Sequence, residues 1–272
     1  MSKKEKDLVV KESNLPSVEV DFDLSLLAEL PTAEASDYKI PALVLVQPTS
    51  KVAGNAGEII DGGSGMVLTS ANKKLEFVPL WHWKTWKKTF ISEKGDRKSL
   101  GSVPATAANA HFRQEREVPV EGGIERREEC TNVFMMLTKD LSSAMPMLYV
   151  MRFKGMAQPE AKKLLTFSTN AINFKQLPFS YVYSITPHLI TNDKGKFYVP
   201  TIQNEVDGGN FKQITGADLQ IVADWVKVIA KNKNAMTGQV EAKLDEAEDS
   251  SYQSDGSSER GSRVVSESSV PF

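Results

Sequence analysis

Short apolar runs separated by turn-forming residues make up the middle of the chain. Residues 42–46 are apolar and are closed by Pro48, and similar runs follow at 66–68, 75–80, 132–137 and 147–153. Runs of this length between glycine, proline and polar turns are typical of β-strands. The segment 192–195 reads Asn-Asp-Lys-Gly between two further runs, which predicts a β-hairpin. Residues 39–235 are therefore expected to form one mainly β domain.

Two segments follow a helical rather than a β pattern. Residues 159–165 begin with a proline, which suits the first turn of a helix because an N–H there would have no intrahelical partner. A second helix is predicted after Thr215, which can cap it. Its apolar residues recur at helical spacing, namely Leu219, Val222, Val226 and Ile229. Short strands separated by turns suggest a small barrel or a sandwich. A helix inserted between strands fits an OB-fold, so we predict an OB-fold-like β-barrel with one central and one C-terminal helix.

The two ends of the chain and one internal segment lack these patterns. Residues 1–38 mix charges with two prolines and predict a flexible N-terminal arm. Residues 92–129 are polar and charged, which indicates a long loop or an exposed hairpin. Residues 236–272 become rich in Ser, Asp, Glu and Gly, and such a segment buries too little apolar surface to offset its ordering entropy. We therefore predict a disordered acidic tail from residue 236 onward.

Charge is distributed unevenly along the chain, whose formal net charge is −2. Residues 1–40 hold nine acidic and five basic side chains, and residues 241–272 hold eight and three. The residues between them hold 18 acidic and 25 basic side chains. A basic body with acidic ends suits a protein that binds a polyanion and carries an electrostatic competitor for it. The alternative is that charge simply fluctuates along the chain.

Three of the four tryptophans lie within six residues, at Trp81, Trp83 and Trp86, among several cations. Alternate side chains of a strand share a face, so Trp86 would lie among cations while Trp81 and Trp83 lie in the core. Cations bind phosphates and rings stack on unpaired bases. The alternative is that Trp86 and Phe90 pack under the following loop. The candidate DNA-binding residues are His82, Lys84, Trp86, Lys87, Lys88, Phe90, Arg113, Arg152 and Lys154.

Signatures of enzymes and of cofactor or metal sites were sought in the sequence. The glycine-rich segment 62–65 lacks the lysine of a phosphate-binding loop, and the three histidines lie far apart. The single cysteine, Cys130, allows neither an intramolecular disulfide nor a cysteine-based metal site. We therefore expect no catalysis, no cofactor and no metal. No run approaches the ~18–20 apolar residues that span a bilayer, and no signal-peptide core follows Met1, so a cytoplasmic protein without membrane contact is expected.

The last three residues are apolar and follow a serine-rich acidic segment. Val270, Pro271 and Phe272 form a tip suited to a partner pocket with a basic rim and an apolar floor. This tip resembles the C-terminal tip of bacterial single-stranded-DNA-binding proteins. Segments 40–47, 75–80 and 192–198 resemble a phage family of OB-fold single-strand binders. One departure is that residues 264–272 contain a single acid, Glu267, where the bacterial tip is densely acidic.

The resemblance implies an OB-fold protein that binds single-stranded DNA without sequence specificity. It implies a role in DNA replication, recombination or repair, in the cytoplasm of a bacterium infected by a bacteriophage. It also implies that Val270, Pro271 and Phe272 recruit replication, repair or transcription proteins. The alternatives are a protein-interaction or transcription-coactivating factor and a virion component, whose bodies would bind no nucleic acid. The pattern predicts no particular oligomeric state.

Overall fold

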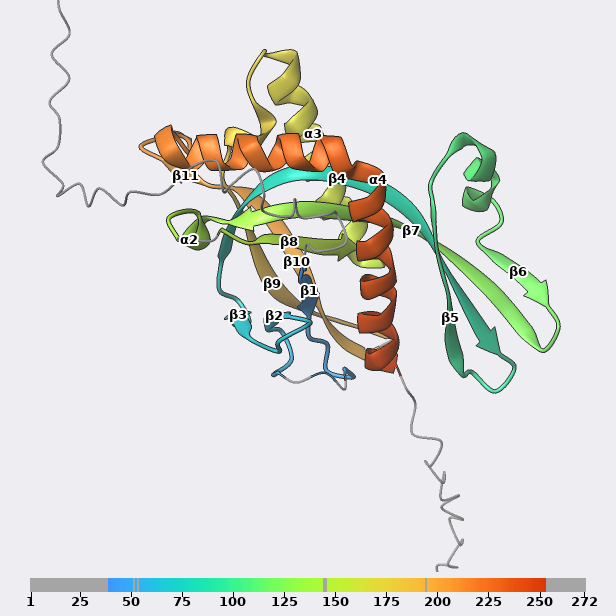
Figure 1. The fold of residues 1–272 in the computed structure, drawn as a ribbon. Helices are drawn as coiled ribbons and strands as arrows, with labels where there is room; N and C mark the ends of the chain where they lie inside the picture. Colours follow the sequence, from blue (N-terminus) through green and yellow to red (C-terminus); the bar gives the residue numbers. More distant parts are fainter. Residues whose placement is uncertain (1–38, 51, 53, 144–145, 194, 253–272) are drawn as a thin grey trace, which may run out of the picture. The chain divides into compact units, whose positions relative to one another are not determined.

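A computed structural model of the chain describes residues 39–50, 52, 54–143, 146–193 and 195–252, and only the backbone of residues 246–252. The predicted N-terminal arm, residues 1–38, and residues 253–272 lie outside the described residues. Figure 1 shows a mainly β structure with helices. The strands are β1 (Ala42–Leu45), β2 (Ile59–Asp61), β3 (Val67–Thr69), β4 (Leu75–Ser92), β5 (Arg97–Pro104), β6 (Glu117–Val120), β7 (Gly123–Leu137), β8 (Leu148–Phe153), β9 (Tyr183–Asn192), β10 (Gly195–Asn204), β11 (Val206–Asp207) and β12 (Asn210–Phe211). The helices are α2 (Thr138–Leu141), α3 (Gln158–Asn173) and α4 (Gly216–Tyr252), with 3-10 turns η2 (Ala107–Arg113), η3 (Gly155–Ala157) and η4 (Pro178–Ser180).

One large sheet organises the described residues. Its strand order is β10-β9-β4-β7-β8-β1-β2-β3, with β5 paired to β4 and β6 paired to β7. The pairs are antiparallel, apart from the parallel pair of β1 and β8. The ladder ends at β10 and β3, so the described strands form an open sheet rather than the closed barrel that we predicted. The hairpin predicted around residues 192–195 is confirmed by the pairing of β9 with β10.

Two strands are much longer than the short strands that the sequence predicted. β4 has 18 residues and β7 has 15, and they stay paired from Phe77–Leu137 to Ser92–Gly123. Their far halves are too polar to be recognised as strands by apolar patterning. There, β5 pairs with β4 and β6 pairs with β7, forming what we call the β-extension, residues 85–130 (Figure 1). The exposed-hairpin alternative for residues 92–129 is therefore nearer to the structure than a long loop.

A bulge in β4 sets which of its side chains face each side of the sheet. The pairing of β4 with β7 shifts by one residue between Pro79 and Trp81. Proline cannot donate to a ladder, and within sheets it is tolerated at such bulges. The shift brings Trp81 and Trp83 onto the same core cluster as Val78. Without it, strict alternation would turn the two tryptophans away from that cluster.

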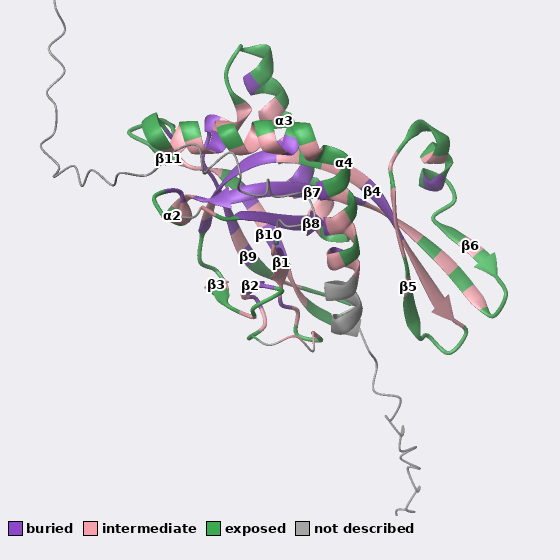
Figure 2. Ribbon diagram, in the orientation of Figure 1, coloured by how far each residue is buried: buried purple, intermediate pink, exposed green. Residues whose placement is uncertain are grey.

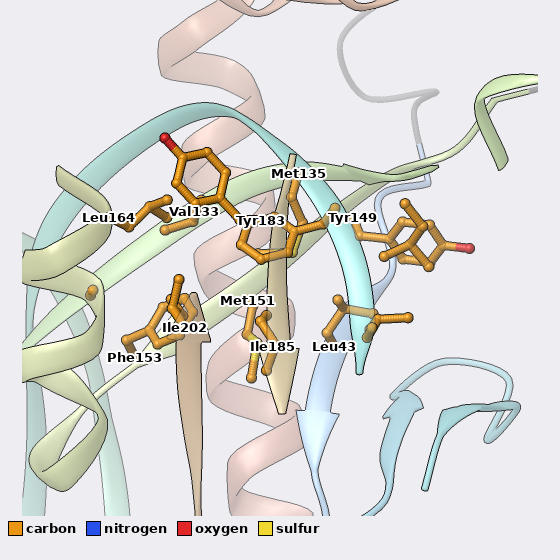
Figure 3. Close-up of a cluster of buried hydrophobic side chains, with 14 of the residues drawn as sticks. Leu43, Val133, Met135, Tyr149, Met151, Phe153, Leu164, Tyr183, Ile185 and Ile202 are labelled. Carbon is orange, nitrogen blue, oxygen red and sulfur yellow. The ribbon is translucent and has the colours of Figure 1, made fainter. Parts of the chain in front are cut away.

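Apolar clusters lie on the two faces of the sheet, one under α3 and one under α4. The first joins strand residues to Ala161 and Leu164 of α3, and Figure 3 shows its tightly packed side chains. Pro159 lies in the first turn of α3, as predicted. In Figure 2 the central strands are buried, whereas the β-extension is mostly half-buried or exposed. The body is therefore held by two cores, and the β-extension projects from them.

Helix α4 continues well beyond the boundary predicted at residue 235. It runs to Tyr252 with a kink at Asn232, whose φ is −110° and ψ is 16°. Val222 and Ile229 are fully buried, as the predicted stripe requires, and so are three later residues: Met236, Val240 and Leu244. The start of the predicted tail, 236–252, is thus helical, because these apolar side chains extend the stripe through a segment that is otherwise polar. None of the described helices is long and apolar enough to cross a membrane.

Candidate nucleic-acid interface

The side chains predicted to share one face of β4 do so, but neighbouring elements cover part of this face. The ammonium of Lys84 lies 3.3 Å from a carboxylate oxygen of Glu129 in β7. The ammonium of Lys88 lies 5.4 Å from the ring centroid of Phe112, which belongs to η2. His82 and Phe90 lie on the same face by alternation. Partial burial and the Lys84 ammonium both lower the pKa of His82, which disfavours the charged imidazole.

Trp86, predicted to stack on bases, is a buried residue with 2% of its surface exposed. Its ring meets that of Phe112 edge-on, with centroids 5.9 Å apart and planes at 78°. The guanidinium of Arg127 lies 4.1 Å from the centroid of Phe112 and completes the stack. Trp86 therefore does not present a ring to a ligand but packs under the segment that follows β4, which is the alternative given for this residue.

Two other residues that were predicted to contact DNA are also buried. Lys87 is 4% exposed and lies on the face of β4 opposite Trp86. Arg152 is 9% exposed, and its guanidinium binds the side chains of Asn132 (3.0 Å), Asp245 (2.5 Å) and Ser102 (3.3 Å). These partners take up the directional donors of Arg152. Arg152 thus belongs to the packing between the sheet and α4, which a strand-by-strand view of the sequence could not foresee.

The core positions predicted for Trp81 and Trp83 are confirmed, since both pack against the cluster under α4. The indole N–H of Trp83 donates to the carboxylate of Glu241 in α4 at 2.8 Å. Its ring lies 4.6 Å from that of Phe134, measured between centroids. Burial raises the pKa of Glu241 against the opposing effects of the Trp83 hydrogen bond and the Arg152 charge. The tryptophan cluster therefore anchors α4.

A hollow lined by cations lies where the end of β8 meets β10 and the residues that follow β1. We call it the seam groove, and it has a volume of about 490 Å³. Five of its lining residues are basic and one is acidic. These are Arg97, Arg126, Arg152, Lys154 and Lys196, with Glu128. Phe197 and Tyr198 of β10 also line it, and the Tyr198 ring lies over Gly57, where an added Cβ would be 2.5 Å away. Arg97, Arg126 and Lys196 are exposed and Lys154 is half-buried, so cations reach the surface of this groove.

Gly155 and Gln47 shape the seam groove. Gly155 follows Lys154 with a φ of +51°, and a Cβ there would lie 3.1 Å from a carboxylate oxygen of Glu128. Glycine therefore lets the chain turn into η3 close to β7. The Gln47 side chain donates to the carbonyl of Tyr198 at 3.0 Å and accepts from its N–H at 2.8 Å. This amide joins the residues after β1 to β10 in place of strand pairing, which is stopped by Pro48.

The structure brings together only some of the predicted residues. Lys154 and Arg152 line the seam groove, whereas the predicted residues of β4 do not. Arg113 is paired with Glu129, at 3.4 Å, outside this groove. Arg97, Arg126 and Lys196 were not predicted from the sequence as site residues. The signal that could have found Arg126 is its alternation with Glu128 on one face of a strand.

The residues of the predicted partner-binding tip, Val270, Pro271 and Phe272, lie outside the described residues. Comparison of the chain with protein-family models, with curated proteins and with solved structures gave no match. The seam groove is therefore interpreted from its own residues alone. Cations of this kind attract anionic groups, and an aromatic ring such as that of Phe197 offers a flat apolar surface.

Proposed function

We propose that this chain binds single-stranded DNA in the seam groove, without sequence preference. The observation that carries the proposal is the set of four cations that reach the surface, with Phe197 and a single acid, in one hollow. Cations that contact phosphates give affinity without reading sequence, because every nucleotide presents the same phosphate. Rings stack on any base for a similar reason. A role in replication, recombination or repair, in the cytoplasm of a bacterium, is part of the proposal.

We also propose that the body is an opened and elaborated relative of the OB-fold architecture. The strands from β10 to β1 surround one core, and α3, inserted between β8 and β9, covers it. The Gln47 hydrogen bonds to Tyr198 bring the two strand ends together without a ladder. The residues that would recruit replication, repair or transcription proteins remain Val270, Pro271 and Phe272.

A binding titration with labelled oligothymidylate tests the proposal. Intrinsic tryptophan fluorescence is a poor reporter because Trp86 is buried and Trp81 and Trp83 pack against a core cluster. Fluorescence anisotropy of the labelled strand avoids this difficulty. We expect binding that weakens as salt rises and is tighter for the single strand than for a duplex of the same length. Absence of binding at every salt concentration would refute the proposal and favour a protein-interaction factor.

A further inference from the structure

A second hollow adjoins the seam groove on the β-extension. We call it the extension groove; its volume is about 430 Å³, and its cations are Arg116, Arg126, Arg127 and Lys162. It shares Arg126, Glu128 and Gly155 with the seam groove. The two hollows are therefore neighbours, and these three residues form the wall between them. A polymer that lies in the first enters the second when it crosses this wall.

The strand pairing explains why the extension groove exists. β6 pairs with residues 123–126 of β7, and β8 pairs with residues 131–136. The N–H of Arg127 still donates to the carbonyl of Arg116, at 2.7 Å, so the gap along this edge of the sheet spans residues 128–130 of β7. The Gln158 side chain, at the start of α3, donates to the carbonyl of Glu129 at 2.6 Å and to that of Phe153 at 3.0 Å. The Gln158 side chain thus supplies a hydrogen-bond donor for a carbonyl on the open edge of β7. It also holds the start of α3, the helix that carries Lys162, beside the gap.

We infer that a single strand bound in the seam groove continues past Arg126 and Gly155 into the extension groove, where Arg116 and Lys162 bind further phosphates. This inference rests on the proposed function. It assigns the β-extension a binding role, so the length of strand that the chain covers depends on it. Both side chains are exposed, which leaves them accessible to a strand.

The acids of the β-extension compete with the strand for these cations. Arg126 pairs with Glu117 at 2.7 Å, and the two side chains are 47% and 51% exposed. Ion pairs as exposed as this one stabilise a fold very little, so a phosphate can replace the carboxylate at small cost. By contrast, Arg127 pairs with Glu125 at 2.7 Å with both side chains largely buried, and this pair stays in place. Removing the Glu117 charge should therefore strengthen binding of a strand that reaches Arg126 from the extension groove.

Binding of a short and of a long oligothymidylate distinguishes the contribution of one groove from that of both. A strand of about four nucleotides fits one groove, and a strand of about sixteen crosses both, the range seen for single domains that bind single strands. Lys162→Glu and Arg116→Glu should each weaken binding of the long strand about tenfold and that of the short strand less than about twofold. Glu117→Gln should strengthen long-strand binding by about twofold to fivefold. Lys227→Glu, at a cation on α4 whose side chain is 73% exposed, is the matched control and should change neither.

The possible outcomes decide between the inference and the proposed function. If both strands bind and Lys162→Glu weakens both equally, or weakens neither, the path into the extension groove is refuted while the proposed function stands. If neither strand binds the unaltered protein at low salt, the proposed function fails. Melting temperatures of the variants within a few degrees of the unaltered protein show that the substitutions act on binding, since all four altered side chains are exposed.

Discussion

Asp245 in α4 and Arg152 in β8 form an ion pair in which one carboxylate oxygen lies 2.5 Å from the guanidinium. The Arg152 side chain is 2% exposed and that of Asp245 is 13% exposed. Asn132 and Ser102 bind the same guanidinium, so the pair lies within a hydrogen-bonded network. The second half of α4 is therefore held to the sheet by charge as well as by its apolar stripe.

Loss of the Asp245 carboxylate should destabilise the fold strongly. Asp245→Ala leaves the Arg152 charge buried without its ion partner, which costs about 3 kcal/mol of unfolding free energy. Asp224→Ala breaks a pair with Lys227 whose side chains are 56% and 73% exposed and should cost less than about 1 kcal/mol. Urea unfolding followed by circular dichroism measures both. Equal midpoints for the two variants would show that the buried pair does not hold α4.

Trp86 and Phe112 should behave as core residues of the β-extension. Trp86→Ala empties a site that is 2% exposed and should lower the unfolding free energy by about 3–5 kcal/mol. Phe211→Ala removes a ring that is 57% exposed and should cost much less. Differential scanning calorimetry of the three proteins makes the comparison. If the Trp86→Ala variant kept its stability but bound single-stranded DNA more weakly, the prediction that Trp86 stacks on bases would be supported instead.

Truncation should locate the end of the folded body. A chain that ends at residue 235 loses the buried side chains of Met236, Val240 and Leu244, each worth about 1.5–3 kcal/mol of apolar burial. This sum is comparable to the whole stability of an ordinary domain, so the chain should be largely unfolded at 37 °C. A chain that ends at residue 252 keeps these contacts and should melt like the full chain. The reverse order of stabilities would contradict the position of α4.

A pair of glycines tests the packing behind the seam groove. Gly57 and Gly95 have nearly the same φ, +88° and +89°, so alanine is strained equally at both. A Cβ at Gly57 would lie 2.5 Å from the Tyr198 ring, whereas nothing lies within 4 Å of one at Gly95. Gly95→Ala should cost about 1–2 kcal/mol, and Gly57→Ala clearly more. Chemical denaturation measures the difference, and equal costs would show that Tyr198 is not held against Gly57.

The elements with regular apolar patterns were predictable from the sequence. The hairpin around residues 192–195, α3 after Pro159 and the first half of α4 all have clear turn signals or helical spacing. The β-extension was not predictable, because strands exposed on both faces carry charged residues where core strands carry apolar ones. The second half of α4 was missed because its three buried side chains lie in a segment whose composition is typical of disorder.

The candidate site was only partly predictable for a related reason. Local patterns identified cations next to rings, as at Lys154 after Phe153, but not which of them tertiary contacts would bury. Trp86 and Arg152 are covered by Phe112 and by Asp245, which are 26 and 93 residues away along the chain. The seam groove combines residues from five strands and their connections, and no spacing rule for one strand predicts such a site.

The salt dependence of single-strand binding tests the central claim, that the cations of the seam groove bind phosphates. The four cations that reach the surface are Arg97, Arg126, Lys154 and Lys196. If each neutralises one phosphate, a plot of log affinity against log salt has a slope of about −3 for the unaltered protein. The double variant Lys154→Glu with Lys196→Glu should bind more weakly and show a slope of about −1.5 or shallower, whereas Lys227→Glu should match the unaltered protein. A double variant with unchanged affinity and slope would contradict the account.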